Sequence, residues 1–145
     1  MRSRLVLIAI LFTLALCVIS TAQQKTPAKV RKVPAPYTEP SAPMQMYKAY
    51  CASCHGVDGK GDGPAASALR APATDLTQLS KKNGGQFPAA RVNSVLSGTA
   101  ELTAHGSEDM PIWGPVFRKL GNDNGSHARL RINNLTKYLE SMQAK

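Results

Sequence analysis

Residues 50–56 read Tyr50-Cys51-Ala52-Ser53-Cys54-His55-Gly56 and bring two thiols and an imidazole together. Tyr47, Tyr50, Cys51 and Cys54 recur at the spacing of one helix face, with Ser41 and Pro43 upstream as start signals. The pattern predicts a first helix, opening near Ser41, that carries both thiols on one side.

Three simple uses of the two thiols leave part of this pattern unexplained. A Cys51–Cys54 disulfide or a thioredoxin-like redox pair does not need His55, and no βαβ pattern accompanies the motif. A zinc site needs two more ligands, and His105 and His127 lie far beyond finger-like spacing.

The order Cys-x-x-Cys-His is instead the pattern of c-type haem attachment. Each thiol adds to one vinyl group of the porphyrin, and the following residue places its imidazole under the iron. The single motif predicts one haem c, attached through Cys51 and Cys54. Only 17 of the 102 residues from Met44 onward are Leu, Ile, Val or Phe, which is few for a folded core. A buried cofactor would complete this core.

The 145-residue chain begins with a segment typical of export. Arg2 and Arg4 precede an apolar run from Leu5 to Ile19, which ends in Ser20-Thr21-Ala22. We interpret residues 1–22 as a secretory signal and expect a periplasmic or secreted protein. The alternatives are an uncleaved signal that associates with the membrane and lipidation at Cys17, although a bulky leucine precedes that cysteine.

Residues 23–43 hold half of the chain's 10 prolines and an excess of basic side chains. Proline disfavours helix and ladder hydrogen bonds, so we expect an extended, basic linker ahead of a folded domain at residues 44–145. The whole chain carries a formal charge of +9. Because export removes nucleic acid as a partner, this charge points to acidic protein surfaces.

From about Ser41 to the C-terminus the sequence resembles the class I cytochromes c, which are small monohaem electron carriers. The resemblance rests on the Cys-x-x-Cys-His motif, a glycine-rich stretch, a Met-Pro pair and a closing amphipathic helix, at residues 47–56, 58–64, 109–114 and 126–142. It implies an all-α, small cytochrome c fold with three to five helices around one covalently attached haem.

The sixth position of the iron separates an electron carrier from a ligand-binding haem. Met110 precedes Pro111, which disfavours helix there and leaves a loop able to aim the sulfur at iron. Met44 and Met46 lie too close to the motif, Met142 belongs to the last helix, and His105 is the competing ligand.

The resemblance adds three expectations about residues near the haem. A Met-Pro pair of this kind supplies the axial ligand in the family, which favours Met110. The Pro64 carbonyl is the expected hydrogen-bond acceptor for the second ring nitrogen of His55. Trp113 either bonds a haem propionate or packs beside the ring.

Two more helices follow from periodicity. One runs from about Pro88 to Leu96, ends before Gly98 and buries Val92, Val95 and Leu96 as core. The other is capped by Gly125-Ser126 and carries Ile132, Leu135, Leu139 and Met142 in one stripe. The glycines from Gly56 to Gly63 either approach the haem edge or form a plain flexible turn.

These features predict a monomeric electron carrier rather than an enzyme. Its iron, ligated by His55 and Met110, would exchange single electrons with periplasmic or membrane partners. One alternative is a fixed haem subunit of a periplasmic dehydrogenase or terminal oxidase, and another is a haem enzyme or gas sensor with an open iron. Basic side chains could steer an acidic partner to the haem edge: Lys48, Lys60, Lys81, Lys82, Arg118 and Lys119.

Overall fold

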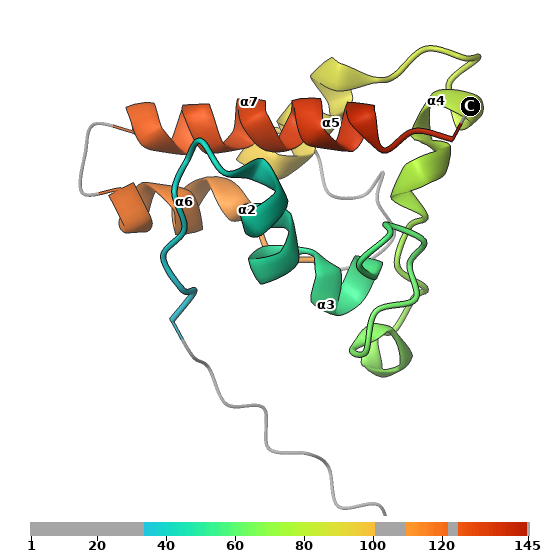
Figure 1. The fold of residues 1–145 in the computed structure, drawn as a ribbon, viewed down its shortest axis with the longest axis horizontal. Coiled ribbons are helices and arrows are strands. Elements are labelled where there is room, and N and C mark those ends of the chain that lie inside the picture. The colour runs from blue at the N-terminus through green and yellow to red at the C-terminus, as the bar shows by residue number, and fades with distance from the viewer. Residues whose placement is uncertain (1–33, 101–109, 122–124, 145) are drawn as a thin grey trace, which may run out of the picture. The chain divides into compact units, whose positions relative to one another are not determined.

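The computed structural model describes residues 34–100, 110–121 and 125–144, and these ranges are helical without any strand (Figure 1). No helix within them is both long and apolar enough to cross a membrane. The predicted all-α class is confirmed. The elements are α2 (Pro43–Tyr50), α3 (Ala52–His55), η1 (Ala66–Ala68), η2 (Leu76–Gln78), α4 (Leu79–Lys82), α5 (Ala89–Ser97), α6 (Trp113–Gly121) and α7 (Ser126–Ser141).

The last helix, α7, is the element against which the others assemble, and it packs on α2, α5 and α6 (Figure 1). Its buried apolar residues recur at spacings of four, three and four, which places them on one face. This face makes the centre of the core with α2, α5 and α6. The residues on it are Ala128, Ile132, Leu135 and Leu139.

Aromatic contacts join α2 to its neighbours. Tyr50, Trp113 and Phe117 form a cluster with ring centroids 5.4 to 5.5 Å apart. Tyr47 meets Tyr138 of α7 at 5.5 Å. Such pairs add to the free energy gained by burial, so α2 is held firmly between α6 and α7.

The predicted helix ends agree with the structure more closely at the later helices than at the first. Gly98 terminates α5 in a left-handed conformation, with φ of 81°, and Gly125 precedes α7. Helix α2 starts at Pro43 with Ala42 as its N-cap, not at Ser41. Helix α6 was not predicted, because Gly114 and Pro115 resemble helix breakers, yet both lie in its first turn, where proline is tolerated.

The segment Pro34–Ala42, which the sequence assigned to the linker, is packed on the helices. The Tyr50 hydroxyl donates to the Pro36 carbonyl over 2.7 Å, and the Asn134 amide donates to the Pro40 carbonyl over 2.8 Å. Pro34 is also the first residue of the compact unit that extends to the C-terminus. Folded structure therefore begins before Ser41. The predicted signal at residues 1–22 and the first part of the linker lie outside the described residues.

The glycine-rich stretch folds back on the end of α3. Its amides at Gly61, Gly63 and Ala65 donate to the carbonyls of His55, Cys54 and Ser53 over 2.8 to 3.1 Å. These carbonyls are among those that a helix leaves unpaired at its C-terminus. The close approach that glycine permits is thus to the backbone of the motif, and none of the residues 56–63 lines the cavity described below.

Gly63 has no room for a side chain, because a Cβ atom there would overlap the carbonyl oxygens of Ala52 and Ser53. We predict that Gly63→Ala lowers the free energy of unfolding by about 2–3 kcal/mol through this overpacking. Chemical denaturation of the full-length protein measures the loss.

Gly84→Ala is the matched control. Gly84 has a positive φ of 67° but nothing within 4 Å of the new Cβ, so only backbone strain of about 1 kcal/mol is expected. A Gly63→Ala variant no less stable than Gly84→Ala would contradict the steric explanation.

Candidate functional site

The Cys-x-x-Cys-His motif spans the junction of α2 and α3. Cys51 breaks the regular helix, with φ of −114° and ψ of −38°, while its amide still donates to the Tyr47 carbonyl over 2.8 Å. The amide of His55 donates to the Cys51 carbonyl over 2.9 Å, which continues the turn. Both cysteines and His55 consequently line one cavity.

This cavity has a volume of about 480 Å³, within the range of small-molecule and cofactor sites. Its walls come from α2, α3, the segment between η1 and α4, α5, the Met110 loop and α7. Most lining residues are apolar, as a porphyrin face requires: Leu69, Ala71, Pro72, Ala73, Leu76, Leu79, Pro88, Val92, Val95, Leu96, Pro111 and Leu139 among them.

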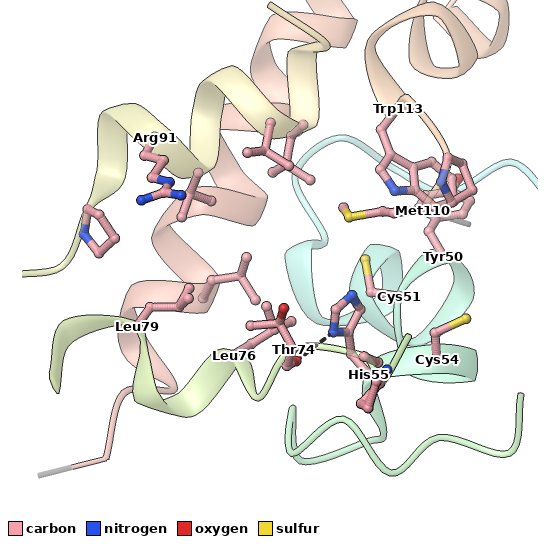
Figure 2. A pocket seen from close by; sticks show the side chains of 18 of the residues that line it. Tyr50, Cys51, Cys54, His55, Thr74, Leu76, Leu79, Arg91, Met110 and Trp113 are labelled. Atoms are coloured by element: carbon pink, nitrogen blue, oxygen red, sulfur yellow. Dashed lines mark hydrogen bonds between the residues drawn. The ribbon is translucent and has the colours of Figure 1, made fainter. Parts of the chain in front are cut away.

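His55 is oriented by one hydrogen bond from its side chain. Its Nδ1 lies 2.9 Å from the Thr74 carbonyl oxygen, so Nδ1 carries the proton and donates. The other ring nitrogen, Nε2, is left as the acceptor and metal-ligating atom. Figure 2 shows the ring directed into the cavity with Thr74 beside it.

Thr74 thus takes the role that the sequence analysis gave to Pro64. Pro64 is exposed and is not among the residues that line the cavity. The reason is the folded-back loop, since the bonds of Gly63 and Ala65 to the end of α3 place the residue between them on the outer side of the helix. The chain reaches the side chain of His55 at Thr74, in the irregular stretch before η2.

The wall that carries Thr74 is held by the C-terminus. The side chain of Gln143 donates to the Leu76 carbonyl over 2.8 Å and accepts from the Ser80 amide over 2.9 Å. The amide of Ala144 donates to the Thr77 carbonyl over 2.9 Å. The acceptor of the His55 proton is therefore fixed by contacts with the far end of the chain.

Met110 lines the same cavity. Figure 2 shows that its sulfur points into the cavity, as the His55 ring does. The other described methionines lie elsewhere. Met44 is half exposed, Met46 is fully buried against α7, and Met142 lies near Gly59. Met110 is thus the thioether that the described part of the chain brings to the cavity. The competing ligand, His105, lies outside the described residues.

Trp113 is 8% exposed and lines the cavity while packing on Tyr50 and Phe117. The two alternatives for Trp113, a bond to a haem propionate and packing beside the ring, both stay predictions. His127, at the start of α7, is exposed and does not line the cavity.

Helix α5 contributes more to the site than its sequence suggested. Val92, Val95 and Leu96, expected as core alone, line the cavity together with Arg91 on the same face. Their spacing of three and four residues could have revealed this face. Lys82 of α4 also lines the cavity, and both cations are otherwise exposed.

The donor set suits a covalently attached haem better than the other uses of two thiols. Both cysteines are free, and burial raises the pKa of the Cys51 thiol to about 12. A neutral thiol is a poor nucleophile for thiol–disulfide exchange, because that reaction needs the thiolate. Within the described ranges no group of three or more His, Cys, Asp or Glu side chains could hold a metal ion.

Comparison with known proteins agrees with this geometry. Searches of curated proteins and of solved structures found no match for the chain. The family model for cytochrome c matches residues 44–143, which include the thiols, the imidazole, Met110 and α7. The chain belongs to the cytochrome c family, and it is a non-enzymatic electron carrier with one covalent haem c.

Proposed function

We propose that this cytochrome c is a freely diffusing, exported carrier of single electrons whose haem iron is ligated by His55 and Met110. The observation that carries the proposal is that both side chains enter one apolar cavity from segments 55 residues apart in sequence. Export is supported by the signal-like residues 1–22 and by the attachment motif.

The haem, once attached, supplies a one-electron ferric/ferrous couple. His55 offers Nε2 to the iron while the Nδ1–Thr74 bond keeps the ring from rotating and raises the basicity of the ligating nitrogen. Met110 offers a thioether, a soft ligand that favours a high reduction potential. With both His55 and Met110 as ligands, the iron would be closed to substrate, which suits electron transfer rather than catalysis.

The apolar walls of the cavity have one role, and its two exposed cations, Lys82 and Arg91, which we call the rim, have another. Leu76, Leu79 and Val92 line the cavity and would exclude water from the iron, which would limit the solvent rearrangement that accompanies a change of charge. Lys82 and Arg91 line the same cavity with their charged ends exposed. We assign to this pair the attraction of acidic redox partners. The six cations named from sequence are all exposed, but Lys82 alone among them lines the cavity.

Replacement of Met110 tests the ligand assignment. In the haem-loaded protein, Met110→Ala should abolish the weak far-red ferric band of sulfur ligation and let carbon monoxide bind the ferrous iron. The reduction potential should fall by on the order of 0.1 V, a fraction of the ~0.8 V that axial ligands span. Visible spectroscopy and a potentiometric titration provide both measurements.

Met44→Ala is the control, because Met44 is half exposed and does not line the cavity. It should leave the spectrum and the potential unchanged. If the unmodified protein lacked the far-red band, Met110 would be removed as the ligand and attention would turn to His105. A band that survived in Met110→Ala would assign it to another methionine.

Charge reversal tests the rim. We predict that Lys82→Glu and Arg91→Glu each slow reduction by anionic ferrocyanide and speed reduction by cationic hexaammineruthenium(II), by about 2- to 10-fold at low salt. Stopped-flow absorbance measures both rates, and both effects should shrink at high salt.

Lys137→Glu makes the same change of charge at an exposed position of α7 that does not line the cavity. If this variant altered the two rates as much as the rim variants do, the overall charge of the protein, and not the rim, would govern the encounter.

A fixed subunit of a larger redox complex is the other candidate. The segment Pro34–Ala42 is packed on its own domain through Tyr50 and Asn134, which shortens the free arm available for attachment. Purification of the tagged protein from its native membrane and periplasmic fractions separates the candidates, because a free carrier elutes as a monomer and a subunit elutes with its complex.

A further inference from the structure

Arg131 of α7 is a fully buried cation that the electron-carrier function does not explain. Its side chain is 0% exposed, and its Nε and Nη2 atoms have no hydrogen-bond partner. Arginine stays protonated in proteins, so the site holds a positive charge. Among the described residues no acidic side chain pairs with it. A buried charge in such surroundings is costly, which makes its presence in this core informative.

The contacts of the guanidinium come from α2 and from the segment Pro34–Ala42, which we call the N-terminal clasp. Nη1 donates to Thr38 Oγ1 over 3.1 Å and lies 3.7 Å from the Met46 sulfur. The Tyr37 ring covers the guanidinium carbon, with 5.1 Å to the ring centroid. The clasp thus encloses the charge.

The hydrogen bonds of the clasp form a chain with one direction. The Tyr50 hydroxyl has a single proton, which it donates to the Pro36 carbonyl over 2.7 Å. The 2.8 Å bond between Thr38 and Tyr50 must then be donated by the threonine hydroxyl, which in turn accepts from Arg131. All donors point away from the charge, and bonds aligned in this way polarise one another.

Before it ends at the Pro36 carbonyl, this chain passes through a residue of the cavity wall, Tyr50. Tyr50 lines the cavity, directly precedes Cys51 and stacks with Trp113, which also lines it. The buried charge and the cavity are therefore linked through two side chains, Thr38 and Tyr50.

We propose that Arg131 is a positioning residue that holds Tyr50 against the haem cavity through Thr38, and that its buried positive charge favours the ferrous state. Reduction adds one electron, and so one negative charge, inside the cavity. A cation buried in a medium of low dielectric constant stabilises that added charge and raises the reduction potential. The inference rests on the attached haem alone and not on Met110 as ligand or on any partner.

The test compares Arg131→Met with Arg129→Met in the haem-loaded, full-length protein. Both remove one positive charge from α7, but Arg129 is exposed. In a spectroelectrochemical titration, Arg131→Met should lower the equilibrium constant for reduction at least threefold, about 30 mV for a one-electron couple. The shift should persist at high salt, whereas any shift in Arg129→Met should vanish there, because buried charges are screened less.

Arg131→Lys keeps the charge and should retain most of the potential. Wild-type potential in Arg131→Met at both salt concentrations, even with a lower melting temperature, would reduce Arg131 to a packing residue and overturn the proposal. A loss of potential in Arg129→Met as large and as salt-resistant as in Arg131→Met would overturn it as well.

Thr38→Val and Tyr50→Phe test the chain without touching the charge, and they decide the matter if Arg131→Met does not fold. Thr38→Val should lower the equilibrium constant for reduction by less than threefold. Adding Tyr50→Phe to the Thr38→Val variant should lower it little further, since both substitutions break the same chain of hydrogen bonds. A wild-type potential in Thr38→Val, or fully additive effects of the two changes, would contradict the proposed path.

Discussion

The site depends on the hydrogen bond that joins His55 Nδ1 to the Thr74 carbonyl, because it decides which ring nitrogen faces the cavity. Several other contacts hold the two partners of this bond in place. On one side the folded-back loop pairs the last carbonyls of α3 and so fixes the end of the helix that carries His55. On the other side Gln143 bonds both Leu76 and Ser80 and holds the segment that carries Thr74. One ring orientation is thus maintained by residues drawn from the middle and the end of the chain.

Much of this arrangement could be predicted from the sequence, and the parts that could not have physical reasons. Side-chain chemistry at fixed spacing identified the motif, and glycine at the helix ends located α5 and α7. The acceptor at Thr74 is a backbone carbonyl, which every residue has, so no residue type marks it. Pro-rich composition predicted an extended segment, but it says nothing about the surface on which Pro34–Ala42 lies.

The protein carries two kinds of positive charge, exposed and buried, and they act at different ranges. Lys82 and Arg91 are exposed, so salt screens them and their influence is on encounter with other molecules. Arg131 is enclosed by the clasp and α2, and its field acts inside the protein. The same sign of charge can therefore set both the speed of association and the energy of the transferred electron, with little interference between the two.

The bond between Arg131 and Thr38 also has a consequence for the order of folding, because its partners lie 93 residues apart. Contacts across so long a separation form late, since the entropy of closing the intervening chain must be lost first. The clasp is made early in synthesis, yet its partner helix α7 is the last to be made. The Arg131 charge can therefore be enclosed only after α7 has been synthesised, although Trp113 and Phe117 of α6 can pack on Tyr50 before then.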